Sequence, residues 1–371
     1  MPRGAGVRGD AVGTAAGPPA PTTTSTPAPA TVPGAPRHRS LALWLGALGA
    51  VVAASLVLAV TIGPADIAPG DVVASLLAHL GLGGQPLGPI QEAIVWQGRA
   101  PRALTAAAVG AGLALCGVAM QGVTRNPLAD PYLLGVSAGA TVGAVAVLLL
   151  GLDLLLPVAA FAGALLALVG TLLLAGGAGG LTPTRTVLAG LAVAQGCAAV
   201  TSFVIFWSAT GDSYREILSW LMGSLAGSSW ATVAIAGVAL LLVGPVLLAD
   251  ARTLDAFTLG EVGAGALGVH VPRARWRLFV LVALLTGALV SVSGAIGFVG
   301  LIVPHAVRLL VGSRHHRVLP VAALAGATFL LWADTAARTV VEPRELPVGI
   351  ITAGLGAPVF ALLLWRRRVR G

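Results

Sequence analysis

Ten runs of mostly apolar residues follow one another along this chain of 371 residues, separated by short clusters of polar residues, glycine and proline. A helix of about 20 residues spans the hydrocarbon core of a bilayer, and most of the runs approach that length. The sequence therefore predicts an all-α polytopic membrane protein with ten transmembrane helices, at 41–62, 102–122, 134–150, 155–175, 186–207, 230–248, 276–296, 297–311, 318–338 and 347–365.

The composition supports a membrane protein. Hydrophobic residues make up 57% of the chain and charged residues only 10%, whereas a soluble domain carries about 25% charged residues. The 50 glycines are typical of closely packed transmembrane helices. Gly135, Gly139 and Gly143 recur every four residues and predict a helix face that a second helix can approach closely. The lipid bilayer is therefore an expected partner.

All 22 residues counted as Lys or Arg are arginine. Because the usual phosphate-binding loop of ATPases and Schiff-base chemistry both need a lysine amine, neither is expected here. The arginines are scattered singly between apolar runs and form no basic face, which argues against nucleic acid as a partner. Cys116 and Cys197 both lie within apolar runs, so we expect neither a disulfide nor a metal site.

The first 40 residues are rich in proline, alanine and threonine, which predicts a disordered leader at 1–40 and a single transmembrane domain at 41–367. No small-residue cleavage signal follows the first run, so we expect it to remain as a span. With the N-terminus inside, 17 of the 22 arginines lie on the inner side. This excess predicts that both termini are cytoplasmic.

Three arginines on the predicted outer side call for a negative partner. Arg99 and Arg102 flank Pro101 at the start of the second run, where a cation opposes the helix dipole by about 0.3–1 kcal/mol. The partner is either local, such as Glu92 or a lipid phosphate, or a group on a docking protein. Arg338 follows Asp334 by four residues, so an internal ion pair is the simpler expectation there.

Two segments are expected to interrupt helices. Asn126, Pro127 and Pro131 predict a rigid inner turn after the second span. Glycines at every third position before Pro304 and His305 predict that the eighth span is short and broken, a pattern that marks transport pathways. A lone histidine in such a place is more often structural than a proton relay.

The inner loop at 249–275 has the pattern of two short helices hinged at glycines, partly apolar yet outside the membrane. Exposed apolar helices need a partner, which favours a docking protein. The alternative is a helix lying flat on the bilayer, which the flanking arginines also favour.

Together these residues resemble the FecCD family, the permeases of ATP-binding cassette importers for ferric siderophores, haem and vitamin B12. The resemblance covers roughly residues 41–367 in order, and the leader lies outside it. Ala100 stands where the family usually has leucine. The motifs that carry it lie at 99–102, 117–121, 126–131, 135–140, 219–224, 259–261, 267–269, 297–305, 333–338, 345–349 and 356–358.

The resemblance implies a type II importer permease fold in the cytoplasmic membrane of a bacterium. It implies that two permease copies, identical or paralogous, pair around the transport path. Two copies of a separate ATPase would bind the inner loops, and an extracytoplasmic substrate-binding protein would deliver the cargo. The chain itself is then expected to be no enzyme and to hold no cofactor.

The resemblance also assigns roles to residues by motif. The segment that couples to the ATPase would contain Leu259, Gly260, Glu261, Leu267 and Gly268. Arg99, Arg102 and Arg338 would face acidic residues of the binding protein. The cytoplasmic gate would lie at Thr182, Pro183 and Thr184, where Pro183 departs from the small hydroxyl residues expected.

A ferric siderophore is the expected cargo on family abundance alone, with haem and vitamin B12 as the alternatives. An ion-coupled secondary transporter would need carboxylates at the midplane, whereas Asp334, the only one within a predicted span, lies near its outer end. A membrane enzyme would need His, Asp or Glu side chains that converge on one cavity, and His305 has no evident companion at ligand spacing.

Overall fold

The structure, a computed structural model, describes residues 40–368 except 64, 66, 153–154, 178–180, 209–210 and 342–343. Apart from Ser40, the predicted leader lies outside the described residues. Within the described part of the chain all regular structure is helical, which confirms the all-α prediction.

Each of the ten predicted ranges contains one long helix, displaced from the predicted ends by at most a few residues. The apolar runs alone therefore located the main helices. In chain order these are α1 (Leu41–Thr61), α4 (Ala100–Thr124), α5 (Val136–Leu149), α6 (Leu156–Gly177), α7 (Pro183–Ser208), α9 (Trp230–Ala249), α12 (Val271–Ser293), α13 (Val299–Val311), α14 (His315–Thr339) and α15 (Val348–Arg368).

Seven helices among the described residues are long and apolar enough to cross a membrane. The other three of the ten are shorter in their apolar part: α5, α13 and, in α15, Val348–Leu362. The total of ten crossings and the cytoplasmic location of both termini therefore stay predictions.

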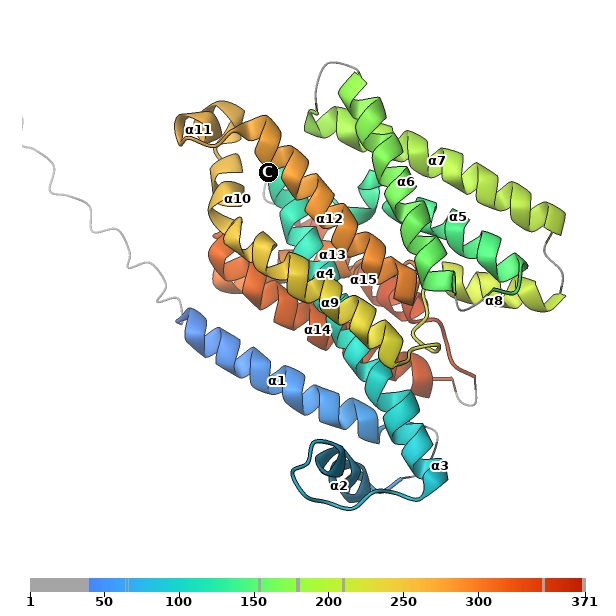
Figure 1. Cartoon of the computed structure of the whole chain (residues 1–371). Coiled ribbons are helices and arrows are strands. Elements are labelled where there is room, and N and C mark those ends of the chain that lie inside the picture. The colour runs from blue at the N-terminus through green and yellow to red at the C-terminus, as the bar shows by residue number, and fades with distance from the viewer. Residues whose placement is uncertain are drawn as a thin grey trace, which may run out of the picture. The chain divides into compact units, whose positions relative to one another are not determined.

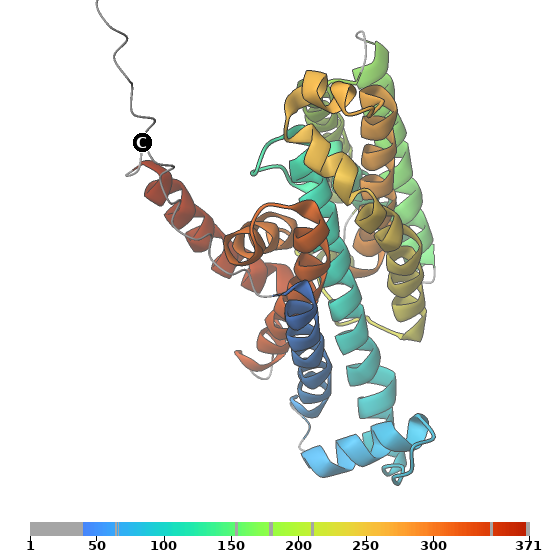
Figure 2. The same cartoon turned by 90° about the vertical axis from the view of Figure 1, so that its left-hand side faces the viewer.

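Shorter helices connect the long ones. α10 and α11 lie at the end of the bundle opposite to α2 and α3 (Figures 1 and 2). The bundle thus has two distinct ends with different short helices. The complete set of short elements is α2 (Pro69–His79), α3 (Pro89–Glu92), the π-helical segment η1 (Ala93–Arg99), the 3₁₀ turn η2 (Pro131–Leu134), α8 (Gly211–Leu221), α10 (Ala251–Phe257) and α11 (Gly260–Ala266) among the described residues.

The core lies around α4, which runs through the bundle and packs against α9, α12, α13 and α14 (Figure 2). Its residues from 109 to 123 are all buried, including Cys116 and Met120. By contrast, α6 and α7 pack with α5, and only 33% and 17% of the residues in their apolar windows are buried. A helix surrounded by other helices can be small and apolar on every face, which matches the alanine and glycine content of α4.

Glycines bring several helix pairs into backbone contact. A Cβ built on Gly139 of α5 would lie 2.3 Å from the carbonyl oxygen of Gly163 in α6, and one on Gly143 would lie 2.0 Å from that of Ala159. Real Cβ atoms do not approach so closely, so both positions need glycine. The predicted close-approach face of α5 is therefore confirmed at Gly139 and Gly143.

The turn after α4 is present. Arg125 ends the helix in the left-handed conformation, at φ +53°. The side chain of Asn126 then accepts a hydrogen bond from the backbone N–H of Leu128 at 2.9 Å. Asp130 accepts one from the N–H of Tyr132 at 2.8 Å, and Pro131 opens η2. Side-chain acceptors and a proline thus reverse the chain without a regular helix.

The seventh and eighth predicted spans meet at 296/297, and the chain is interrupted there, between Gly294 at φ +66° and Phe298 at φ +69°. The eighth span is short, as predicted, but the predicted break at Pro304 and His305 is wrong, because both residues lie inside α13. Proline at 304 removes the N–H that would bond to the carbonyl of Gly300. The side-chain amide of Gln121 donates to that carbonyl at 3.1 Å, so α13 continues through Pro304.

Candidate functional site

One candidate site is the segment of α10 and α11 at one end of the bundle. Leu259, Val262 and Leu267 are 65%, 89% and 64% exposed, whereas Leu254 and Phe257 of α10 are buried in the core. The structure thus has the two short helices that the loop pattern predicts, and the exposed apolar side chains lie on α11 and its flanks, whereas α10 packs into the core. An exposed apolar group of this kind is typical of a surface that another protein or the bilayer covers.

Two glycines delimit α11. Gly260 begins the helix at φ +85° and Gly268 follows it at φ +82°. Side chains other than glycine are strained in this left-handed region, so both positions set the direction of the segment. Among the five residues assigned to coupling by resemblance, Gly260 and Gly268 therefore shape the segment, while Leu259, Glu261 and Leu267 present side chains from it.

An ion pair lies at the base of this segment. Arg277 of α12 donates to Asp250, which joins α9 to α10. Burial raises the pKa of Asp250 above its usual value, and the neighbouring Arg277 opposes that rise.

Arg275 contacts both the exposed segment and the residues that precede α7. One guanidinium nitrogen lies 2.5 Å from a carboxylate oxygen of Glu261, and the other donates to the carbonyl oxygen of Leu181 at 2.6 Å. Arg275 is 4% exposed. From the sequence, Arg275 was one of the arginines that indicate membrane orientation and that flank the loop at 249–275, with no partner assigned within the chain. Its spacing could have indicated an internal partner, because Arg275 lies on the same stripe of α12 as the apolar residues Val271, Ala274 and Leu278.

The predicted gate residues lie at the start of α7. The Thr182 hydroxyl accepts a hydrogen bond from the backbone N–H of Arg185 at 3.3 Å, and Pro183 is the first helical residue. Proline is favoured at this position, because its missing N–H would have no partner there. Thr182 and Thr184 are exposed. Capping of the helix therefore accounts for the proline that departs from the family pattern, and the gate role stays a prediction.

The three outer arginines form a second cluster at the opposite end of the bundle. Arg102 of α4 lies 2.9 Å from Asp334 of α14 and 2.7 Å from Glu345. Asp334 is 1% exposed and also lies 3.5 Å from Arg338 in its own helix. The predicted Asp334–Arg338 pair is therefore present, and the same carboxylate also supplies the partner that Arg102 requires.

Arg99 and Arg338 bind the end of α1. Arg99 donates to the carbonyl oxygens of Val60, Thr61 and Ala65 at 3.3, 3.1 and 2.7 Å. Arg338 donates to the carbonyl oxygen of Ala59 at 3.0 Å. The last carbonyls of a helix have no partner within the helix and carry partial negative charge, so cations stabilise them.

These contacts change the interpretation of the arginine cluster. Arg99, Arg102 and Arg338 are 6%, 8% and 4% exposed, so their guanidinium groups are directed into the chain. Glu92, the local partner considered for the first two, instead accepts hydrogen bonds from Ser75 at 2.9 Å and from the N–H of Leu87 at 3.1 Å. The structure supplies internal partners for all three arginines, and the docking role stays a prediction.

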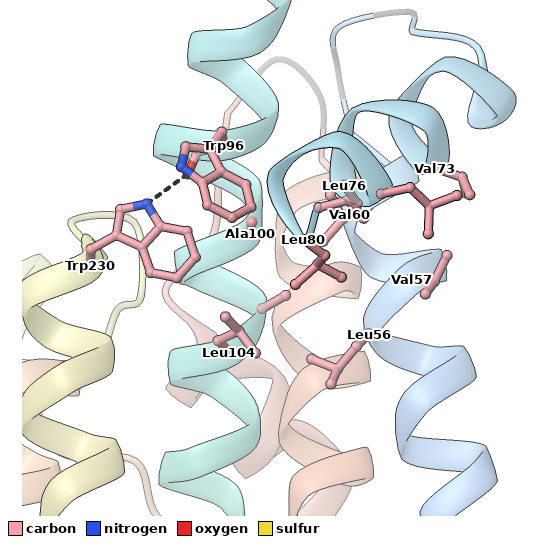
Figure 3. A pocket seen from close by; sticks show the side chains of 12 residues that line it. Leu56, Val57, Val60, Val73, Leu76, Leu80, Trp96, Ala100, Leu104 and Trp230 are labelled. Atoms are coloured by element: carbon pink, nitrogen blue, oxygen red, sulfur yellow. Dashed lines mark hydrogen bonds between the residues drawn. The ribbon is translucent and has the colours of Figure 1, made fainter. Parts of the chain in front are cut away.

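An apolar cavity of about 540 Å³ lies beside this cluster, between α1, α2, α4 and the start of α9. Trp96 and Trp230 close one side, and the indole N–H of Trp230 donates to the carbonyl oxygen of Trp96 (Figure 3). The remaining lining is aliphatic. This cavity therefore offers no charged group to a cargo. Among the described residues, no group of three or more His, Cys, Asp or Glu side chains is placed to hold a metal ion.

Comparison with known proteins gives consistent matches over most of the chain. A sequence model described as the FecCD transport family matches residues 51–366. A cobalamin import system permease protein of Halobacterium salinarum is 43% identical over 363 residues, which cover 88% of this chain and 97% of the relative. A hemin transport system permease protein of Yersinia pestis is 44% identical, covering 73% of this chain and 82% of the relative.

A solved structure shares the fold. It is described as an inward-facing conformation of a candidate metal-chelate type ABC transporter, with a TM-score of 0.75 and 34% sequence identity. The match covers 87% of this chain and 98% of the other.

Proposed function

Because the chain belongs to the FecCD transport family, we propose that it is the permease subunit through which an ATP-binding cassette importer carries a metal chelate across the cytoplasmic membrane. Permeases of this class are not enzymes, and the ATPase is a separate subunit. The chain contains no lysine, which is consistent with ATP hydrolysis on another polypeptide.

The observation that carries the proposal is the exposed apolar segment at 259–267, formed by α11 and its flanks. Leu259, Val262 and Leu267 are exposed there, and α11 lies at the end of the bundle opposite α2 (Figure 1). We assign the ATPase contact to this segment, with Leu259, Gly260, Glu261, Leu267 and Gly268 as the residues that resemblance selects. An apolar surface rimmed by Glu261 and the α12 arginines suits a protein partner.

In this proposal the chain acts as a two-state gate. A binding protein delivers the chelate, and closure of two ATPase subunits displaces the α10–α11 segments of two permease copies. That displacement rocks the helices and opens or closes the path near Thr182, Pro183 and Thr184. Large exposed apolar side chains on α7, such as Phe206 at 87%, support an apolar contact for this helix, either with the second copy or with lipid.

For the cargo we propose a ferric siderophore, with haem and cobalamin as the competing chelates of the same class. The relatives named above carry cobalamin and hemin in their names. All three cargoes hold a metal inside a bulky organic ligand. Selection among them depends on the binding protein as well as on the permease.

The test is uptake by reconstituted vesicles. The chain, with the ATPase and binding protein that co-purify with it, is supplied with ferric ferrichrome, haemin or cyanocobalamin as separate probes. We expect ATP-dependent accumulation of one probe, and no ATP hydrolysis or accumulation by the chain alone. Accumulation by the chain alone, or driven by a proton gradient without ATP, would contradict the importer proposal.

A further inference from the structure

Arg275 is the buried member of three alternating arginines at the start of α12. Arg273 is exposed, and the side chain of Arg277 is 52% exposed. The side chain of Arg275 is 5% exposed. It shares the helix stripe of Val271, Ala274 and Leu278, which faces the interior. A charged side chain on that stripe costs free energy unless its partners compensate it.

The partners of Arg275 come from two segments that are distant in the sequence. Glu261, in the first turn of α11, supplies the negative charge, and its own side chain is 46% exposed. Leu181, two residues before α7 begins, supplies a carbonyl oxygen. The planar guanidinium group holds donors at fixed angles, so it can bind both acceptors at once, which a lysine ammonium does less well.

The Leu181 contact is close to the first turn of α7. Thr182 caps that turn, and its carbonyl accepts hydrogen bonds from the N–H and the hydroxyl of Thr186 at 3.0 and 2.9 Å. A shift of Leu181 is therefore carried directly into the helix. The Nε of Arg275 is buried without a hydrogen-bond partner among the described residues, so its two terminal nitrogens carry the interaction.

We infer that Arg275 is a positioning residue that ties the exposed α11 segment to the inner start of α7, so that a partner that displaces α11 also moves the residues at 181–184. This inference rests on the proposed function, because it gives the contact through which the ATPase would act on the gate. Its basis is the geometry of Glu261, Arg275 and Leu181.

The test uses the full complex in vesicles and measures cargo accumulated per ATP hydrolysed. Arg275→Gln removes the charge but keeps an amide donor, and Glu261→Gln removes the charge of its partner. Because Glu261 also belongs to the proposed ATPase contact, the affinity of the ATPase for each complex is measured alongside. We expect each variant to lower this ratio roughly tenfold, within the usual range for coupling between two sites. Because both act on one pair, the double variant should lose little more than either single one.

Two controls separate positioning from general stability. Arg273→Gln removes the same charge from an exposed neighbour on α12 and should leave the ratio unchanged. Exchange of the two charges, Glu261→Arg with Arg275→Glu, restores the ion pair but not the hydrogen bond to Leu181. We therefore expect it to recover part of the ratio, whereas damage to the fold alone would lower the amount of complex without changing the ratio.

A second measurement needs no cargo. Spin labels at Ala266, an exposed residue of α11 outside the assigned contact residues, and at Leu188, which is 59% exposed, report the distance between α11 and α7 in a Cys197→Ser background. In the complex with parental Glu261 and Arg275, trapping with ATP, Mg²⁺ and vanadate should move α11 and the start of α7 together. The distance between the two labels should then keep one narrow distribution. In the Arg275→Gln complex the distribution should broaden.

The outcomes are distinguishable. Parental complexes without ATP-driven uptake would overturn the proposed function. Parental complexes that transport, together with Arg275→Gln and Glu261→Gln variants of unchanged ratio and unchanged label distances, would overturn the role of Arg275 alone. If Arg275→Gln fails to assemble, Arg275→Lys decides the question, because it keeps the charge and the pair with Glu261 but is less able to bind both acceptors at once.

Discussion

Arg102 and Arg338 share the buried carboxylate of Asp334, and Arg338 and Arg99 cap the last turn of α1. The conflict between Arg102 and the dipole of its own helix is thereby resolved by a carboxylate 232 residues away in the chain. These arginines join α1, α4 and α14 at one end of the bundle. Their replacement is expected to affect stability as well as any contact with a partner.

We expect Asp334→Asn to destabilise the purified chain by about 3–5 kcal/mol, because it leaves buried cations without their shared counter-ion. The measurement is the thermal unfolding midpoint in detergent. Asp71→Asn, at an exposed position of α2, is the matched control and should leave the midpoint unchanged. Equal midpoints for both variants would show that Asp334 does not stabilise the cluster.

The same geometry affects how the docking role is tested. Replacing Arg102 with Glu would place a carboxylate beside Asp334, so lost uptake in that variant would follow from damage to the fold. The partly exposed Glu345, whose side chain is 40% exposed, is a better position for a surface test.

A pH dependence is expected from Asp130, in the connection between α4 and η2. Burial raises its pKa from 3.8 to about 6, and the N–H of Tyr132 opposes the rise. The fold thus favours the protonated acid. The stability it contributes is fully present below about pH 3.8 and is lost as the pH rises through about 6.

Asp130→Asn keeps an oxygen that can accept from the N–H of Tyr132 but cannot ionise. The unfolding midpoint of the parental chain should therefore fall relative to that of the variant as the pH rises from about 4 to about 6.5. Midpoints measured in one detergent at several pH values check this. A constant difference across that range would show that Asp130 does not titrate with a raised pKa.

At the scale of helices, close packing depends on positions where only glycine fits. The α5–α6 contact has Gly139 and Gly163 facing each other, with each built Cβ within 2.3 Å of the other's carbonyl oxygen. The α4–α14 contact has the same arrangement at Gly110 and Gly326. Such contacts set the distance between two helices, because in lipid the attraction between helices comes largely from packing.

Gly139→Val is expected to separate α5 from α6 and to destabilise the chain by about 1–3 kcal/mol through overpacking. Gly237→Val in α9 is the matched control, since a Cβ at Gly237 meets no atom within 4 Å. Thermal unfolding of both variants in detergent tests this expectation. Equal loss in the two variants would mean that the contact of Gly139 with α6 does not determine the result.

At the scale of the whole molecule, the bundle has one end with buried arginines and another with an exposed apolar segment. The core helix α4 and its neighbour α14 run between them. In the proposed importer, force enters at α10 and α11, and Arg275 passes part of it to α7. Rigid helices held by backbone contacts can carry such a motion over their whole length.

Part of the candidate site was accessible from the sequence. The short helices α10 and α11, the turn at Asn126 and the Asp334–Arg338 pair follow from local patterns of glycine, proline and four-residue spacing. The partners of Arg102 and Arg275 did not follow, because they come from segments far apart in the chain. The predicted break at Pro304 was wrong, because the amide of Gln121, from another helix, donates to the carbonyl that the proline leaves without a donor.

The amino-acid sequence by itself determined where the long helices lie. A long apolar run in lipid must satisfy its backbone hydrogen bonds within itself, whatever surrounds it. Only the tertiary structure decided which faces of those helices are buried and which charges meet. Several of the helices are apolar on all sides, so their pattern does not show which side packs inward. Arg102 meets Asp334, and Arg275 meets Leu181, only once the helices have packed.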